Sequence, residues 1–230
     1  MRYNDTGTII KDLQGYFKMD QLYRMEEAAV RFRDKVLIRL LTRSGRRVTE
    51  IIGRKGYVYN YPPRKMTKFY PSVPGITPSD LDEEECMIRY RILKKRLIWN
   101  PHKRVMEHPS VMKTIDKDTM DMLLQYIEQA NIKPQERIFP INRHRVYQII
   151  RECADRAGIP LVGSKTAHPH HFRHSFAVHI IKNATNPSAL RLLQRELEHS
   201  NINVTAGYLQ FDQKEIKTLR EKTFSKKVRH

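Results

Sequence analysis

Cysteine is scarce in this chain, which has only Cys86 and Cys153 among its 230 residues. Two cysteines cannot build the disulfide framework of a small secreted domain, and these two do not form the CxxC pair of zinc ribbons and fingers. This usage is typical of proteins that fold in a reducing compartment.

Long apolar runs are also missing. No stretch approaches the roughly 18 consecutive apolar residues that span a bilayer. The opening sequence MRYNDTGTIIKDLQ lacks the apolar centre of a secretory signal. We therefore expect a soluble, cytoplasmic protein with no membrane partner.

Acidic residues are outnumbered by basic ones. The chain has 25 Asp and Glu against 43 Lys and Arg, which gives a formal net charge of +18. A field of this sign attracts polyanions, so nucleic acid is the first partner to consider, although ribosomal proteins share this balance. With 40% hydrophobic residues, the length suits one main domain around a single core.

Six segments place apolar residues at helical spacing. They are residues 21–42, a short stretch from about Val48, residues 117–130 and 143–157, the sequence PHHFRHSFAVHIIKNATNP, and a helix opening at Asn186-Pro187. Gly45 ends the first segment, which puts Arg47 at a helix–turn–helix junction. In the fifth, Phe172, Phe176 and Ile180 form one apolar row that we expect to face the core.

Residues 53–75 break the helical pattern. They include four prolines, three glycines, four tyrosines and five basic residues, a composition typical of an irregular loop. Basic side chains between aromatic rings suit phosphates and exposed bases, so the segment is interpreted either as a DNA-binding flap or as a solvated surface loop. The candidate DNA-binding residues are Arg54, Lys55, Arg64, Lys65 and Lys68.

Residues 87–99 alternate apolar and basic side chains, which is the pattern of a half-exposed strand. Asn100-Pro101 supplies a turn before a second strand near residues 104–112. The sequence thus predicts a basic β-hairpin within a mainly α-helical domain, so that the whole is mainly α with a small antiparallel β-sheet.

Candidate groups for binding an anion follow in the second half of the chain. His170 and Arg173 are three residues apart and share one face of a helix, a polar face that we expect to be open to an anionic substrate. Tyr208 follows His199 by nine residues (208 − 199). A metal site is an alternative, because His170 and His174 have i, i+4 spacing, but no acidic residue lies in that run to complete a ligand set.

Three of these stretches resemble the signature boxes of the tyrosine recombinase, or phage integrase, family. RDKVLIRLLTRSGRRVTEI resembles the first box, with its glycine, arginine and Ser/Thr-Glu pair at Gly45, Arg47, Thr49 and Glu50. PHHFRHSFAVH resembles the second box with its His-x-x-Arg, and ELEHSNINVTAGY resembles its end, a His followed nine positions later by the nucleophilic Tyr. The resemblance runs from about residue 20 to 211.

The resemblance implies the tyrosine recombinase catalytic-domain fold and an enzyme that cleaves and rejoins DNA through a 3′-phosphotyrosine. The implied catalytic residues are Tyr208 as nucleophile, Arg47, Arg173, His170 and His199. Two guanidiniums suit the charge that builds up on the phosphate, and imidazoles suit proton handling near neutral pH. No metal, ATP or other cofactor is therefore expected.

The leaving 5′-oxygen needs a proton, and the resemblance implies a lysine of the basic hairpin as its donor. Lys94 matches the family position best, while Lys95 and Lys103 stay open because a slip of one residue in a strand swaps its faces. The sequence departs from the family at Glu198, which stands where a glycine usually precedes the histidine of the third motif.

The resemblance divides the chain into a lead segment, residues 1–19, a catalytic domain, residues 20–211 with the 53–75 insertion, and a tail, residues 212–230, for contacts between protomers. It does not include the family's amino-terminal DNA-clamping domain. The expected partners are double-stranded DNA and further copies of the chain, as a tetramer on DNA, in site-specific recombination or integration. The alternatives are a type IB topoisomerase-like nicking and relaxing enzyme, or a non-catalytic DNA-binding protein that kept the fold.

Overall fold

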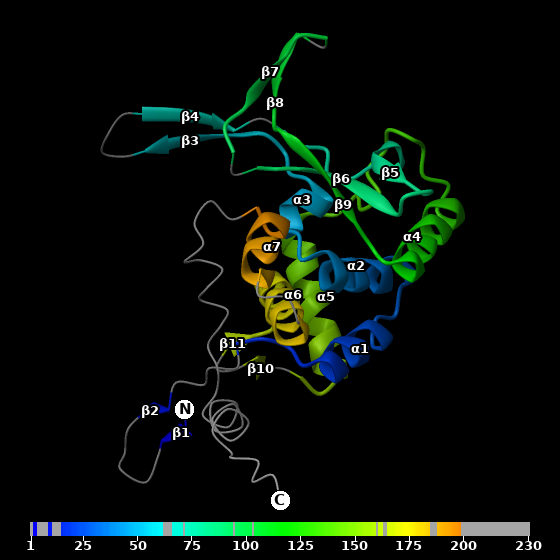
Figure 1. Ribbon diagram of the computed structural model, residues 1–230, viewed down its shortest axis with the longest axis vertical. Helices are drawn as coiled ribbons and strands as arrows, with labels where there is room; N and C mark the ends of the chain where they lie inside the picture. The colour runs from blue at the N-terminus through cyan, green and yellow to red at the C-terminus, as the bar shows by residue number, and fades with distance from the viewer. Residues whose placement is uncertain are drawn as a thin grey trace, which may run out of the picture.

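The computed structural model of the chain describes residues 2–3, 9–10, 15–61, 66–70, 72–93, 95–102, 104–159, 161–162, 165–184 and 188–198. The helices are α1 (Met19–Glu27), α2 (Phe32–Ser44), α3 (Val48–Ile52), α4 (Lys117–Gln129), α5 (Arg143–Arg156), α6 (Pro169–Asn183) and α7 (Ala189–Glu196). They form one body, from which two β-hairpins project at the top of Figure 1. The predicted class, mainly α with small antiparallel sheets, is confirmed.

All strand pairs within the described residues are antiparallel. A three-stranded sheet has the order β5-β6-β9, formed by Leu81–Asp82, Met87–Arg91 and Ser110–Thr114, after a short 3-10 helix at Pro78–Asp80. The two-stranded pairs are β1 (Arg2–Tyr3) with β2 (Ile9–Ile10), β3 (Tyr57–Tyr61) with β4 (Met66–Tyr70), β7 (Ile98–Asn100) with β8 (Val105–Glu107), and β10 (Leu161–Val162) with β11 (Lys165–Thr166).

Helix α2 occupies the middle of the core. It packs against α1, α4 and α6, and its apolar residues Val36, Leu37, Ile38, Leu40 and Leu41 are all buried. A helix that is apolar on most of its circumference needs neighbours on most sides. Contacts with three helices therefore hold α2 in the core, and its C-terminal end leads into the turn that carries Arg47.

The predicted helix over residues 21–42 is wrong in one respect, because the structure has two helices there, α1 and α2. Ala28 caps α1, and the chain then turns so that the apolar stripes of both helices reach the same core. Glu26 of α1 accepts a hydrogen bond from Arg39 Nε of α2 at 2.8 Å across the turn. Neither a glycine nor a proline marks this break in the sequence.

The irregular loop predicted for residues 53–75 is also wrong, because β3 and β4 form an antiparallel hairpin there. The register pairs Tyr57 with Tyr70 and Val58 with Phe69, so aromatic and β-branched residues, which favour strands, supply the pairs. The glycines and prolines that broke the helical pattern fall outside the two strands.

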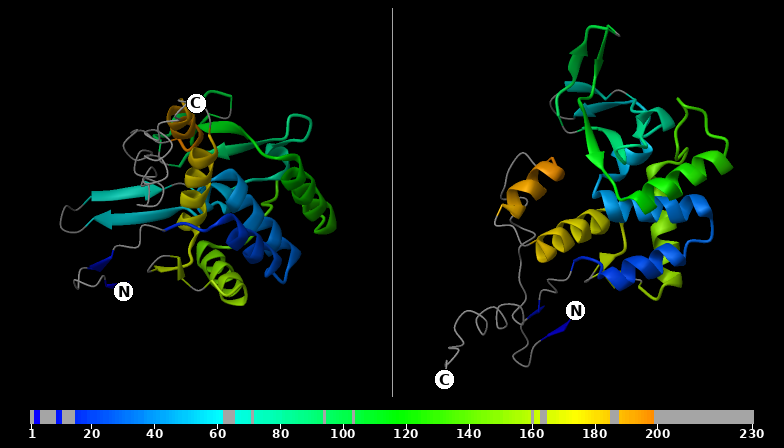
Figure 2. Two further views of the ribbon diagram at one scale, coloured as in Figure 1. Left: turned by 60° about the horizontal axis from the view of Figure 1, so that its bottom comes forward. Right: turned by 45° about the vertical axis from the view of Figure 1, so that its right-hand side comes forward.

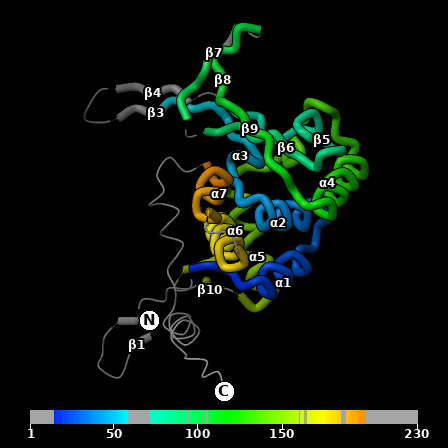
Figure 3. Tube along the Cα trace, viewed as in Figure 1, coloured from blue at the N-terminus to red at the C-terminus, as the bar shows by residue number. Residues whose placement is uncertain are grey.

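The predicted hairpin over residues 87–112 is confirmed, but in two parts. In β6, Ile88 and Tyr90 are buried and Arg89 is exposed, as the alternation predicted. The strand then breaks after Arg91, and β7 with β8 continues as a separate ribbon that leaves the body at the top of Figure 3. The turn at Asn100-Pro101 lies at the tip of this ribbon.

The helices predicted over residues 117–130 and 143–157 are confirmed as α4 and α5. Asp116 and Asn142 cap them by accepting hydrogen bonds from backbone N–H groups. In α6 the expected apolar row fails at Ile180, which is 44% exposed. Helix α7 begins at Ala189 behind Ser188, rather than at Asn186-Pro187, which lie outside the described residues.

Packing begins before the predicted domain boundary at residue 20. Phe17 is fully buried, its backbone N–H donates to Ser175 Oγ at 2.7 Å, and its carbonyl lies 2.9 Å from His179 Nε2. The end of the lead segment is thus part of the helical body (Figure 2). Within the described residues, no helix combines the length and apolar character needed to cross a membrane.

Candidate active site

Arg47 is placed by a tight turn between α2 and α3. Gly45 ends α2 in the left-handed region, with φ of 59°, and Arg47 is the residue that precedes α3. A Cβ atom on Gly45 would lie 2.4 Å from the ring of Phe176 in α6. Both the backbone conformation and this close approach require glycine.

Glu50 fixes the orientation of Arg47. Its carboxylate accepts one hydrogen bond from the Arg47 backbone N–H at 3.0 Å and another from Arg47 Nη1 at 2.8 Å. The Glu50 side chain is fully buried, whereas that of Arg47 keeps 14% of its surface exposed. A buried carboxylate thus holds a guanidinium at the surface, in the charge-assisted geometry that gives the stronger hydrogen bonds.

Arg173 lies in the first half of α6 and is only 5% exposed. Its Nη1 donates to the Gly45 carbonyl at 2.7 Å and its Nη2 to the Leu197 carbonyl at 2.6 Å. Gly45 and Leu197 are the C-cap residues of α2 and α7, and carbonyls at the ends of helices have no partner within their own helix. One buried guanidinium therefore supplies donors to two helix ends.

This placement corrects one expectation. His170 and Arg173 were predicted to share an open polar face of α6, and only His170 is exposed. Arg173 is covered because α6 packs against both α2 and α7. The sequence spacing was right, but it could not reveal which elements cover each side of the helix.

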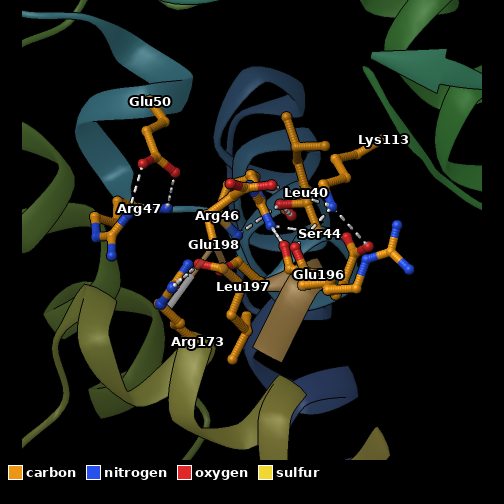
Figure 4. A network of polar contacts seen from close by, with 12 residues as sticks. Leu40, Ser44, Arg46, Arg47, Glu50, Lys113, Arg173, Glu196, Leu197 and Glu198 are labelled. Atoms are coloured by element: carbon orange, nitrogen blue, oxygen red, sulfur yellow. Dashed lines mark hydrogen bonds and ion pairs between the residues drawn. The ribbon is translucent and has the colours of Figure 1, made fainter. Parts of the chain in front are cut away.

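The bonds of Arg173 bring three distant segments together (Figure 4). Gly45 lies two residues before Arg47 in the same turn. The hydrogen bond from Arg173 to the Gly45 carbonyl therefore connects the second candidate arginine to the turn that carries the first. Leu197 lies two residues before His199, so its carbonyl brings the segment that leads to the third motif to the same place. Within the described residues, the first motif, the second motif and the residues that precede His199 therefore lie together.

A second group of charged residues adjoins this junction and was not predicted. Arg46 is buried, donates a hydrogen bond from Nη2 to the Glu196 carbonyl, and lies over the Tyr90 ring at 5.6 Å. Lys113 of β9 contacts the carboxylates of Glu196 at 3.2 Å and Glu198 at 3.7 Å. Figure 4 shows Arg46, Lys113, Glu196 and Glu198 near the end of α7.

The sequence held only weak signals for this group. Exposure alternates along β9, and Lys113 takes one of its less exposed positions. A charged side chain at an inward position of a strand indicates a buried partner, but only the tertiary contacts identify Glu196 and Glu198 as that partner. Arg46 directly precedes Arg47, and nothing in the sequence tells the fully buried arginine from the partly exposed one.

Of the three candidate proton-donating lysines, Lys95 is among the residues that the structure describes. Lys95 follows β6, and its Nζ contacts Glu198 Oε2 at 2.7 Å. Lys94 and Lys103 lie outside the described residues, as do His199 and Tyr208. The catalytic roles of all these residues stay predictions.

The histidines of α6 differ in their surroundings. His171 is buried, and its ring stacks on that of His168 with 3.7 Å between centroids. Burial, followed by the neighbouring imidazole of His168, lowers the pKa of His171 to about 4. In the part of the chain that the structure describes, no three His, Cys, Asp or Glu side chains gather into a group that could hold a metal.

A basic pocket of about 710 Å³ lies beside the α3 segment. Its lining includes Thr49 of the first motif, Arg54 and Lys55 of the insertion, and Arg137 and Arg143 from the segment around the start of α5. Arg54 and Lys55 thus lie near the candidate site, and Arg137 and Arg143 are basic residues that the sequence did not single out. Arg64 and Lys65 lie outside the described residues, as does the side chain of Lys68.

Comparison with known proteins decides the family. The sequence profile of the phage integrase family matches residues 81–215, which is more than half of the chain. This chain belongs to the phage integrase family. The matched residues 81–215 include helices α4 to α7. They also include four of the candidate catalytic residues, His170, Arg173, His199 and Tyr208.

Curated family members match a shorter stretch. A tyrosine recombinase of Pseudothermotoga lettingae is 32% identical over 93 residues, which are 39% of this chain and 30% of that protein. The tyrosine recombinase XerD of Chlorobaculum tepidum is 40% identical over 85 residues, 37% of this chain and 25% of that protein. The matches thus cover less than a third of these relatives' own length.

Solved structures of family members share the fold over nearly the whole chain. The XerA recombinase gives a TM-score of 0.63 at 19% identity, covering 94% of this chain and 66% of that one. The XerH site-specific recombinase bound to difH substrate gives a TM-score of 0.56 at 17% identity, covering 94% and 58%. The fold is that of tyrosine recombinase catalytic domains.

Proposed function

We propose that this chain is the catalytic domain of a site-specific DNA recombinase or integrase that cleaves and rejoins DNA through a 3′-phosphotyrosine at Tyr208. The observation that carries the proposal is the junction at Arg173. Its bonds to Gly45 and Leu197 bring Arg47, Arg173 and the segment leading to His199 to one place. A protein that only binds DNA has no need for that convergence together with a tyrosine nine residues beyond His199.

The two arginines stabilise charge on the phosphate. Attack on a phosphodiester increases the negative charge on its non-bridging oxygens, and guanidiniums neutralise it through forked hydrogen bonds. Arg47 is held ready by Glu50 at the surface of the turn. Arg173 supports the turn through Gly45, so a small movement of its guanidinium toward a bound phosphate would be coupled to the position of Arg47.

The proton balance requires a base and an acid. The Tyr208 oxygen forms a bond to phosphorus as the bond to the 5′-oxygen breaks, and the phenolic proton passes to His170 or His199. A hairpin lysine, with Lys94 as the leading candidate, gives its proton to the departing 5′-oxygen. The phosphotyrosine ester keeps the bond energy, so attack by a second 5′-hydroxyl rejoins DNA without ATP or a metal.

Double-stranded DNA is the proposed substrate and partner. The net charge of +18 and the basic pocket around Arg54, Lys55, Arg137 and Arg143 support it, as does the similar fold of the Tn1549 transposon integrase, whose structure was solved in complex with transposon right end DNA. We place the protein in the cytoplasm, associated with DNA. Further copies of the chain, as a tetramer on DNA, complete the assembly, with residues 212–230 as the contact segment.

The experiment is capture of a covalent protein–DNA adduct. A pool of duplexes with a randomised centre and a nick beside it would be incubated with the protein, because loss of the short cleaved strand prevents rejoining. We expect an adduct that resists denaturation, forms equally with and without a chelator, and vanishes in Tyr208→Phe. No adduct, or one that persists in Tyr208→Phe, would overturn the proposal.

The same preparations separate recombination from relaxation. A recombinase joins strands of two captured sites, whereas a topoisomerase-like enzyme relaxes supercoiled plasmid without exchanging partners. Sequences enriched in the adduct would be placed on two plasmids, and the expected product is the joined molecule. Relaxation without joined product would favour the topoisomerase-like alternative.

A further inference from the structure

Glu198 occupies an unusual backbone position beside the candidate site. It follows Leu197, the C-cap of α7, and has φ of 54°, in the left-handed region that glycine adopts most easily. A side chain with a Cβ atom is strained there. A residue that keeps such a conformation needs compensating contacts from its surroundings.

The compensating contacts come from two lysines of the β6–β9 hairpin. The Glu198 carboxylate lies 2.7 Å from Lys95 Nζ and 3.7 Å from Lys113 Nζ. Although burial raises the pKa of Glu198, the hydrogen bond and charge of Lys95, with Lys113 and Arg46 behind it, lower that pKa overall. The carboxylate is therefore ionised at neutral pH, and the ion pairs persist.

The two lysines differ in how firmly they are held. Lys113 also contacts Glu196 at 3.2 Å and the Arg195 carbonyl at 3.1 Å, and its side chain is only 14% exposed. Lys95 has Glu198 as its ion-pair partner within the described residues, and its side chain is 57% exposed. Lys113 thus anchors the carboxylate, and the carboxylate in turn holds Lys95.

The segment that carries Glu198 also belongs to the candidate site. The Leu197 carbonyl accepts a hydrogen bond from Arg173, and His199 follows Glu198 in the sequence. We propose that Glu198 is a positioning residue, which tethers the lysine-bearing turn after β6 to this segment and so holds the proton-donating lysine beside the phosphate. Lys95 is the tether, and its neighbour Lys94 remains the leading candidate for the donor. This inference rests on the proposed function.

A tether fits the charges better than a direct contact with DNA. The carboxylate has the same sign as a phosphate and would repel it. The turn after β6 carries consecutive basic residues, Lys94, Lys95 and Arg96, that would repel one another and the site arginines without a counter-charge. Glu198 supplies that counter-charge through its contact with Lys95.

The tether itself is tested without DNA. Trypsin cuts after basic residues of exposed, mobile segments, so the rate of cutting at residues 94–96 reports how firmly the turn is held. Glu198→Gln and Glu198→Gly should increase this rate about threefold or more, because both remove the charge that holds Lys95. Glu196→Gln is the matched control, since Glu196 contacts Lys113 and not Lys95, and its rate should stay near wild type. An unchanged rate in both Glu198 variants would overturn the tether.

The role in positioning is tested on two DNA substrates, ordinary DNA and DNA whose bridging 5′-oxygen is replaced by sulfur. A thiolate leaves without a proton, so a defect in proton donation disappears on the sulfur substrate. Glu198→Gln should slow cleavage of ordinary DNA about tenfold, which is less than the usual contribution of a general acid because the donor is displaced and not removed. It should slow cleavage of sulfur DNA less than about twofold. Equal slowing on both substrates, or faster cleavage of ordinary DNA, would overturn the proposal.

Glu198→Gly guards against an effect on folding. It removes the carboxylate but also relieves the left-handed backbone, so it should unfold no more easily than wild type while showing the same cleavage defect as Glu198→Gln. If Glu198→Gly instead cleaves ordinary DNA at the wild-type rate, the Glu198 carboxylate does not position the proton-donating lysine. If the wild-type protein forms no adduct on either substrate, the proposed function fails, and the trypsin result still decides whether the tether exists.

Discussion

Arg173 and Gly45 lie 128 residues apart in the sequence, yet Arg173 Nη1 donates to the Gly45 carbonyl at 2.7 Å. This carbonyl is one of those that the end of α2 leaves without a helical partner, and a buried guanidinium provides the donor. The contact joins the first and second motifs. Substitutions at the turn should therefore change stability and the geometry around Arg47 together.

Gly45→Ala should destabilise the protein strongly. The left-handed φ of 59° costs about 1 kcal/mol for alanine, and the collision with Phe176 adds about 1–3 kcal/mol. Gly158→Ala is the matched control, because Gly158 has a similar φ of 68° but no heavy atom lies within 4 Å of the added Cβ. Urea denaturation of both variants measures the difference. Equal losses of unfolding free energy would contradict the close packing of the turn on α6.

Arg47 and Glu50 allow stability and chemistry to be separated. Arg47→Ala leaves the buried carboxylate of Glu50 without its guanidinium partner, which should cost about 3 kcal/mol, and it should slow cleavage about 10²-fold. In the double variant Arg47→Ala/Glu50→Gln no buried charge remains unpaired, so most of the stability should return. The cleavage rate should stay low. A double variant that regains the rate would remove Arg47 from the catalytic set.

The parts of the fold that followed from the sequence are those with strong local signals. Helices α4 and α5 have apolar residues in helical register and capping side chains at Asp116 and Asn142, and both were placed correctly. The break between α1 and α2 has no such signal, because it arises from packing against the core. Residues 53–75 misled the prediction since their glycines and prolines flank two strands.

The candidate site divides in the same way. Spacing within one element was enough to nominate Arg47 at the junction before α3 and to put His170 and Arg173 on α6. The burial of Arg173 depends on α2 and α7, which are distant in sequence. The contacts of Lys113 with Glu196 and Glu198 join residues 83 or more apart in the sequence, and no local pattern encodes them.

Stability should depend on pH through His171. Its native pKa is about 4 against an ordinary value of 6.5, so between these values the unfolded chain binds more protons than the native state. Unfolding free energy should therefore fall as the pH drops from 6.5 toward 4, by up to about 1.4 kcal/mol per pH unit from this group.

His171→Phe keeps an aromatic ring against His168 and removes the titrating group. We expect a smaller loss of stability between pH 7 and pH 5 in this variant than in wild type, measured by urea denaturation at both values. Equal losses in the two proteins would mean that other groups cause the dependence.

Lys55 should contribute to DNA binding. It is exposed and lines the basic pocket beside α3. If it contacts a phosphate, Lys55→Gln should make the negative slope of log K against log salt shallower by about 0.9. Lys117→Gln, an equally conservative change in an exposed lysine of α4, is the control and should leave the slope unchanged. If Lys55→Gln also keeps the wild-type slope, the pocket lies outside the DNA interface.

The central claim is that Tyr208 attacks the phosphate, and the most direct measurement is to locate the DNA in the adduct. The captured complex would be digested with nuclease and protease, and the peptide that carries the residual nucleotide sequenced by mass spectrometry. We predict a 3′-phosphate ester on Tyr208, within the peptide that contains NVTAGYLQF, and a free 5′-hydroxyl on the released strand. A nucleotide attached to any other residue, or a 5′-phosphate linkage, would contradict the account.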